Sequence, residues 1–205
     1  MNIKLNFVDF SNDPSNSDIV IIQKNQAPGF DTLAVAWRVI RNCGRGNHHP
    51  FQFPLSLEVN AEDQWGNHNP RLKAAPGALF AMKLNPSGHE LVTAGTAGNP
   101  EEVQVRNDLE RGAVTVNLYR DGRLVATKDD VAPGQLAAFK LKPIIYIGVA
   151  SQVEEGANLN SAVISAINTE ISLEGIIQAD IVMTGGGAGP DAKPFEFRLE
   201  NTVKA

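Results

Sequence analysis

Residues 112–151 limit the possible folds of this chain more than any other stretch. Between residues 114 and 119, apolar and polar side chains alternate, which is the period-2 pattern of a strand with one buried face. Asp121 and Gly122 then supply the positive-φ residues of a tight hairpin turn, and residues 124–127 return as the partner strand. This part of the chain therefore predicts a β-hairpin.

A second turn and two further strands are expected in the same stretch. Pro133 and Gly134 fit positions i+1 and i+2 of a type II turn. Residues 136–141 follow as a strand, and residues 144–149 are apolar on both faces, which is typical of a strand in the middle of a core. We interpret residues 112–151 as the centre of an antiparallel sandwich.

The rest of the chain repeats this pattern of short apolar or alternating segments separated by turn residues. Further strands are expected at residues 3–7, 19–22, 33–40, 51–59, 78–84, 90–94, 103–105, 171–173, 177–183 and 195–203. Residues 33–40 are expected to form a central strand, and Pro54 places the 51–59 strand at a sheet edge or a bulge. The segment 156–169 fits either a strand or a short helix. The prediction is an all-β fold: one antiparallel β-sandwich domain of roughly ten strands over residues 1–205.

Three stretches carry a resemblance to known proteins: residues 11–20, 33–53 and 180–187. They are similar to segments of small microbial β-sandwich proteins that have no assigned activity. The resemblance implies the fold and brings no functional residue with it.

The charge of the chain and its targeting signals restrict the partners and the cellular location that we expect for this protein. The net charge is −5 and no run of Lys or Arg occurs, so we expect no nucleic-acid partner. No apolar run is long enough to span a membrane. Cys43 is the single cysteine, which excludes an intramolecular disulfide and fits a reducing compartment. Without a signal-peptide pattern at the N-terminus, we expect a cytoplasmic protein or one exported without a classical signal peptide.

All four histidines fall in expected loops or turns, where an all-β protein can form a metal site. The nearest template is the cupin barrel, and the candidate ligands for a transition metal are His48, His49, Glu58, His68 and His89. The match is poor, because adjacent residues of a strand point to opposite faces, so His48 and His49 cannot both ligate one metal. Solvated loop histidines are the alternative.

Two other loops partly resemble known ligand-binding motifs, one for calcium and one for phosphate, but neither matches its motif well. Asp9, Asp13 and Asp18 suggest calcium, but the loop lacks the glycine and terminal Glu of an EF-hand, so Asx turns are preferred. The glycine-rich segment 184–190 lacks the Lys and the following helix of a phosphate-binding loop, so we expect a mobile loop there.

The expected loops at residues 42–50 and 61–70 remain as binding surface. Trp65 with Asn67, His68 and Asn69 offers what a sugar-binding loop needs, namely an aromatic platform and hydrogen-bonding side chains. His48 and His49 are the candidates in the other loop. Phe30 and Trp37 are interpreted as core residues.

The sequence contains no catalytic motif of the Gly-x-Ser-x-Gly kind, and no catalytic residue is assigned. We expect a non-enzymatic, lectin-like protein that binds a carbohydrate or another surface ligand through these two loops. Two alternatives stay open: a self-associating or membrane-active sandwich of the toxin type, and a metal-dependent enzyme that uses the loop histidines. Exposed sheet edges make a homodimer plausible.

Overall fold

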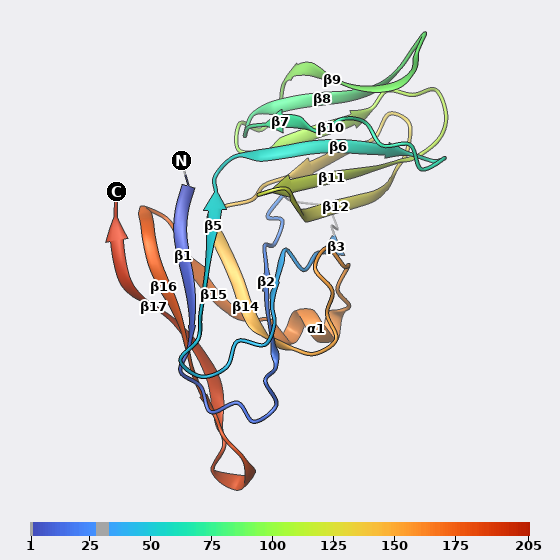
Figure 1. Ribbon diagram of the computed structural model, residues 1–205. Coiled ribbons are helices and arrows are strands. Elements are labelled where there is room, and N and C mark those ends of the chain that lie inside the picture. The colour runs from blue at the N-terminus through green and yellow to red at the C-terminus, as the bar shows by residue number, and fades with distance from the viewer. Residues whose placement is uncertain (1, 28–32) are drawn as a thin grey trace. The chain divides into compact units, whose positions relative to one another are not determined.

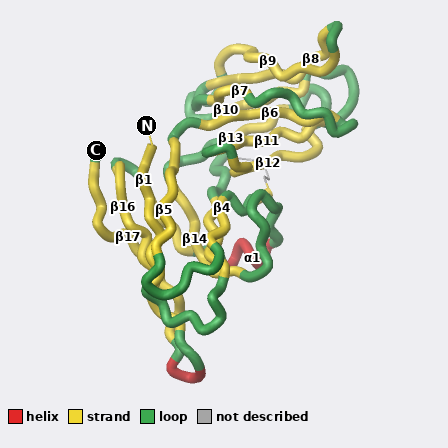
Figure 2. The backbone as a smooth tube through the Cα atoms, viewed as in Figure 1, coloured by secondary structure: helices red, strands yellow, loops and turns green. Residues whose placement is uncertain are grey.

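The computed structural model describes residues 2–27 and 33–205 and is nearly all β, with 58% strand and 5% helix. It confirms the all-β, sandwich-like fold class (Figure 1). The described residues form seventeen strands rather than roughly ten, because several predicted strands are divided and several short edge strands were not expected. Loops connect the strands (Figure 2), together with two short helical segments at Ser161–Ala166 and Gly189–Asp191.

The chain divides into two compact units, and each unit is assembled from separate segments. Unit 1 contains residues Met1–Gln23, Val35–Leu55 and Pro143–Ala205, and unit 2 contains Lys24–Ala34 and Ser56–Lys142. Each unit contains two sheets. Whether residues 1–205 form a single domain stays a prediction.

Unit 1 contains two four-stranded sheets, which we call sheets A and B. In spatial order, sheet A consists of β17 (Lys193–Lys204), β16 (Ile176–Gly186), β1 (Asn2–Asp9) and β5 (His48–Pro54). Sheet B consists of β15 (Thr169–Ser172), β14 (Ile144–Ala150), β2 (Asp18–Ile22) and β4 (Arg38–Ile40). Within sheets A and B, all neighbouring strands are antiparallel except β1 and β16, which run parallel.

The core of unit 1 follows from strand alternation. Ile3, Leu5 and Phe7 occupy every second position of β1 and are fully buried, as the period of two requires. Trp37 has no exposed surface, and its ring packs edge-on against Phe53 with the centroids 5.5 Å apart. The interpretation of Trp37 as a core residue is confirmed. Phe30 lies outside the described residues.

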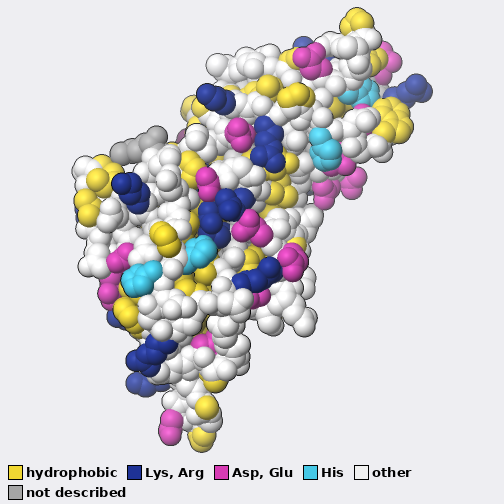
Figure 3. All heavy atoms as spheres, viewed as in Figure 1, with side chains coloured by type: hydrophobic (Ala, Val, Ile, Leu, Met, Phe, Trp, Pro, Cys, Tyr) yellow, Lys and Arg dark blue, Asp and Glu magenta, His cyan; other side chains and the backbone are white. Residues whose placement is uncertain are grey.

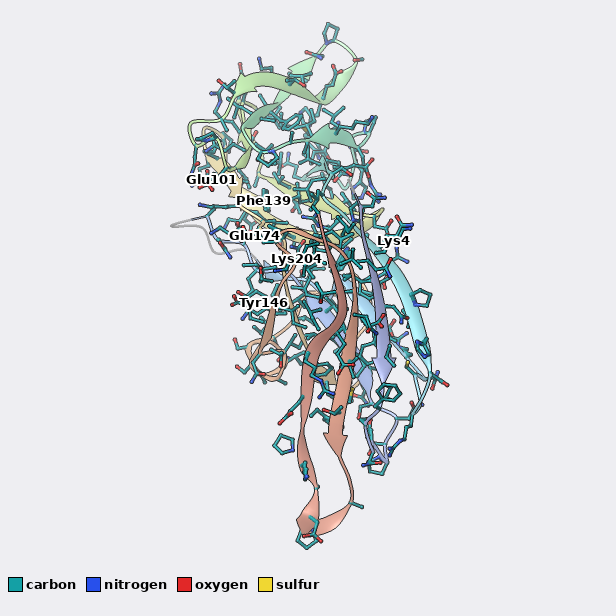
Figure 4. All side chains as sticks on the ribbon, turned by 90° about the vertical axis from the view of Figure 1, so that its left-hand side faces the viewer. Lys4, Glu101, Phe139, Tyr146, Glu174 and Lys204 are labelled. Carbon is teal, nitrogen blue, oxygen red and sulfur yellow. The ribbon has the colours of Figure 1, made fainter. Side chains whose placement is uncertain are left out.

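Unit 2 contains a five-stranded and a four-stranded sheet, which we call sheets C and D. Sheet C consists of β3 (Leu33–Ala34), β12 (Arg123–Val131), β11 (Val114–Arg120), β6 (Leu57–Asp63) and β7 (Leu72–Ala74). Sheet D consists of β13 (Leu136–Phe139), β10 (Val103–Asn107), β8 (Ala78–Asn85) and β9 (Gly88–Thr96). Phe139, labelled in Figure 4, is in β13 and is almost completely buried.

Both turns predicted in the 112–151 stretch are present in unit 2. Asp121 and Gly122 have φ angles of 54° and 71° and connect β11 to β12. The Gln135 amide donates to the Ala132 carbonyl at 2.9 Å, and Gly134 has a φ of 78°, as a type II turn requires. The local turn chemistry was therefore predictable from the residues alone.

Three predicted stretches are wrong in the same way, because the chain passes from one unit to the other within each. The expected central strand 33–40 is divided into β3 and β4, which are edge strands of different units. The expected strand 51–59 is divided into β5 and β6, and the stretch 112–151 is divided between Lys142 and Pro143. The alternation of apolar and polar residues predicts that a side chain is buried, but it does not predict against which sheet the side chain packs. Pro54 does end an edge strand, as predicted.

The ambiguous segment 156–169 contains a helix. Helix α1 (Ser161–Ala166) is capped by Asn160, whose side-chain oxygen accepts a hydrogen bond from the Val163 amide at 3.0 Å. No helix of the described residues is long and apolar enough to cross a membrane.

Candidate binding sites

The residues proposed as metal ligands are distributed over both units. His48 and His49 begin β5 in unit 1, whereas His68, His89 and Glu58 belong to unit 2. Within residues 2–27 and 33–205, no three His, Cys, Asp or Glu side chains come together as a metal-binding group. The histidines that the sequence suggested as one site are thus not assembled into one.

His48 and His49 point to opposite faces of sheet A, as the strand period predicted. The His48 Nδ1 atom lies 3.1 Å from the side-chain nitrogen of Asn6, on the face of β1 that does not contribute Phe7 to the core. The His49 ring lies on the other face, 6.4 Å from the ring of Phe51.

The three aspartates considered for calcium serve local structure. Asp9 accepts a hydrogen bond from the Ser11 amide at 2.6 Å, and Asp13 accepts from the Ser15 amide at 2.9 Å. Both are side chain-to-backbone bonds to the residue two positions on, which defines an Asx turn. Asp18 lies 3.7 Å from the Arg41 guanidinium. The Asx-turn interpretation of this loop is confirmed at Asp9 and Asp13.

A cluster of side chains at one end of unit 2 contains most of the predicted sugar-binding loop. We call Asp63, Trp65, Asn67, Asn69 and His89 the Trp65 cluster. Its centre is Asp63, the last residue of β6, whose side chain is only 4% exposed. One carboxylate organises the whole cluster.

The Asp63 carboxylate accepts hydrogen bonds from three other members. Its Oδ1 accepts from the backbone amides of Trp65 at 2.9 Å and Asn67 at 3.0 Å. The Asn67 side-chain nitrogen donates to Oδ2 at 3.1 Å, and the His89 Nδ1 lies 3.1 Å from the same oxygen. Because β6 belongs to sheet C and β9, which contains His89, to sheet D, the Asp63–His89 contact joins the two sheets.

These hydrogen bonds also set the protonation of Asp63. Burial acts to raise the pKa of the Asp63 carboxyl, but the hydrogen bonds from Asn67, Trp65 and His89 outweigh it and hold the pKa below its ordinary value. The carboxylate is therefore ionised at neutral pH and remains a strong acceptor.

Trp65 is presented to solvent in a fixed orientation. Its exposed fraction is 65%, yet the indole is stacked on the His89 ring, with the centroids 5.4 Å apart and the planes 29° from parallel. His89 is itself held by Asp63 and is 16% exposed at its side chain. Hydrophobic, histidine and acidic side chains meet at this end of unit 2 in the space-filling view (Figure 3).

Of the four residues predicted as sugar-binding in this loop, Trp65, Asn67 and Asn69 belong to the Trp65 cluster. Asn69 joins the cluster by donating to the His89 carbonyl at 2.9 Å. His68 does not join it; its ring faces Glu62, with Nδ1 3.6 Å from the carboxylate. His89 was expected only as a metal ligand, and Asp63 was missed. An Asp before Trp and Gly is a recognisable Asx-turn signal, so Asp63 could have been found.

A second candidate site lies in unit 1 and was not predicted as a whole. Two hollows share Asn12 as a lining residue, and we call them together the Asn12 hollow; their volumes are about 600 and 440 Å³. The larger is lined by Phe10, Asn12, Thr184, residues 185–188, Asp191, Lys193, Pro194 and Glu196. The smaller is lined by Asp9, Ser11, Asn12, Asp13, Asn16, Asn42, Gly44, Arg45 and Asn47. The predicted loop 42–50 thus supplies one wall.

Glycines allow the backbone strands around the larger hollow to approach closely. Gly185 has a φ of 91°, and a Cβ placed there would overlap the carbonyl oxygen of Pro194. At Gly186 a Cβ would lie 3.0 Å from the backbone carbon of Asn12 and 2.8 Å from the Phe195 ring. The glycines therefore permit a packed hairpin end.

Comparison with protein-family models, curated proteins and solved structures found no match for this chain.

Proposed function

We propose that this chain is a non-enzymatic carbohydrate-binding protein and that the Trp65 cluster binds the sugar. The observation that carries the proposal is the state of Trp65, which is 65% exposed while its ring is fixed by stacking on His89. Burying a large side chain of this kind is worth about 2–3 kcal/mol. An exposed indole that is nevertheless held in place is well suited to bind a ligand.

The chemistry of the cluster fits a sugar. A pyranose ring presents C–H groups on its faces and hydroxyl groups at its edge, so it needs an aromatic surface next to hydrogen-bonding side chains. Trp65 provides the surface. Within the part of the chain that the structure describes, both hydrogen bonds of the Asn67 side chain go from its nitrogen to Asp63, so its carbonyl oxygen is available to accept a hydroxyl.

The rigidity of the Trp65 cluster and the negative charge of the chain restrict the kind of glycan that can bind. Because Asp63 and His89 fix the platform before binding, little side-chain freedom is lost when a ligand arrives. The chain has a net charge of −5, and the Asp63 carboxylate lies beneath the platform, so a polyanionic glycan would be repelled. A neutral glycan is the proposed ligand.

The chain offers a direct test, because Trp65 and Trp37 are its two tryptophans and Trp37 has no exposed surface. Acrylamide quenching of tryptophan fluorescence therefore reports Trp65. Soluble tetrasaccharides of glucose, mannose and N-acetylglucosamine are the probes, and the sugar that binds is expected to protect Trp65 from quenching.

Two variants complete this test. On a glycan array, Trp65→Ala is expected to lose binding, whereas Val203→Ala, which truncates a 45% exposed side chain in β17, is expected to retain it. If the array profile of Trp65→Ala matches that of the unmodified protein, the Trp65 cluster is not the binding site.

A further inference from the structure

We infer that the Asn12 hollow of unit 1 is a second carbohydrate-binding site, so that each unit carries one. The inference rests on the proposed function, because it assigns to unit 1 the ligand class proposed for the Trp65 cluster. It is carried by separate observations: the two hollows, an exposed aromatic ring at one of them, and the lining chemistry.

The size and the aromatic ring fit a short sugar chain. The hollows of about 600 and 440 Å³ fall within the range of small-molecule sites, about 300–1,000 Å³. Asn12 lines both hollows, and we expect a ligand of more than one sugar ring to contact both. Phe10 lines the larger hollow and is 47% exposed, which offers a ring face for stacking, as Trp65 does in unit 2.

The backbone around Asn12 is fixed before any ligand binds. The Asn12 amide donates to the Gly185 carbonyl at 2.8 Å, and the Phe10 amide donates to the Met183 carbonyl at 2.9 Å. Asn12 also forms an isolated parallel bridge with Gly186. Segment 10–12 thus continues the β1–β16 pairing, which fixes the direction of the Phe10 and Asn12 side chains.

Asn12 is placed to donate to a ligand. Its side-chain oxygen accepts a hydrogen bond from the Arg45 guanidinium, which fixes the orientation of the amide. The side-chain nitrogen donates to no group within residues 2–27 and 33–205, although Asn12 lines both hollows. An oriented amide donor of this kind suits a hydroxyl oxygen.

The charges around the hollows favour a neutral ligand over an anion. The larger hollow has the carboxylates of Asp191 and Glu196 and the ammonium of Lys193. The smaller has two carboxylates, Asp9 and Asp13, and one guanidinium, that of Arg45. Each hollow therefore carries more negative than positive charge, which disfavours a phosphate or nucleotide. The remaining polar lining consists of hydroxyl and amide groups, which bind sugar hydroxyls.

With one site in each unit, the chain is expected to bind a dense glycan surface more tightly than a single site would. Two linked sites on one chain raise the apparent affinity by about 10²–10⁴ over either alone when both can engage. For a short soluble sugar, the same arrangement gives two binding events per chain.

Isothermal titration calorimetry with the same three tetrasaccharides counts these sites. The unmodified chain is expected to bind two molecules of the preferred sugar, and Phe10→Ala and Trp65→Ala are each expected to bind one. The double variant is expected to bind none. Asn12→Asp, which keeps the side-chain size and removes the amide donor, serves as a second variant of the hollow should Phe10→Ala fail to fold.

The outcomes separate this inference from the proposed function. A single site that Trp65→Ala removes and Phe10→Ala and Asn12→Asp leave intact overturns the second site and supports the first. A single site with the opposite response overturns the role of Trp65 and supports the hollow. No binding of any of the three sugars, or binding that survives in the double variant, overturns both.

Discussion

The Trp65 cluster and the Asn12 hollow hold their shapes by different means. In the cluster, side chains are arranged around one buried carboxylate, that of Asp63, which accepts hydrogen bonds from Trp65, Asn67 and His89. In the hollow, backbone segments approach closely, and Gly185 and Gly186 make that approach possible. The first site is therefore sensitive to the loss of a hydrogen-bond acceptor, and the second to the addition of a methyl group.

The two sites also differ in how far apart their residues lie in the sequence. Four members of the Trp65 cluster lie between residues 63 and 69, and His89 is the one distant member. The Asn12 hollow combines segments 9–16, 42–47 and 184–196. A local cluster can be recognised from a short motif, whereas a site made of three distant segments requires the fold.

The largest effect is expected from Gly185→Ala. The new methyl group would overlap the Pro194 carbonyl oxygen at a φ of 91°, so we expect a loss of about 3 kcal/mol or more in the free energy of unfolding. Chemical denaturation measures it. Gly122→Ala is the control, because that glycine also has a positive φ but nothing within 4 Å of a Cβ; about 1–2 kcal/mol is expected. Equal losses would contradict a hollow shaped by backbone approach.

Asp63→Ala is expected to have the next largest effect. It removes the acceptor of the Trp65 and Asn67 amides and of His89, at a cost of about 2–3 kcal/mol in unfolding free energy. The variant is also expected to increase acrylamide quenching of Trp65, because its support on His89 is loosened. Unchanged quenching would show that the platform does not depend on the carboxylate.

The stability that Asp63 contributes is expected to depend on pH. Since the folded-state pKa of this carboxyl is lowered, its contribution is fully present above the unfolded-state value of about 3.9. It is lost as the pH falls through the folded-state pKa. The stabilisation that the unmodified chain has over Asp63→Asn should be present at about pH 5 and shrink below about 4. A difference that grows on acidification would have the wrong sign.

The smallest effect on stability is expected at the two exposed rings. Phe10 and Trp65 are 47% and 65% exposed, so Phe10→Ala and Trp65→Ala should each change the unfolding free energy by about 1 kcal/mol or less. Thermal or chemical denaturation of both variants checks this. A much larger loss at one ring would identify it as a packing residue and weaken its assignment to a binding site.

Sequence reasoning found much of the Trp65 cluster and little of the Asn12 hollow. Trp65, Asn67 and Asn69 share one short loop, so their proximity follows from the chain itself. His89 joins them only because the ends of β6 and β9 meet across two sheets. Phe10 and Asn12 carried no signal, because their position beside Gly185 depends on the parallel pairing of β1 with β16.

The sequence by itself determined the all-β class and the local turns, because alternation and turn residues act over a few positions. Asp121, Gly122 and Gly134 adopt the expected positive φ, and Pro54 ends an edge strand. The tertiary structure decided how strands are shared between two units. It divided the strands expected at 33–40 and 51–59, since burial can be satisfied by either unit. Only long-range pairing selects which apolar face each strand meets.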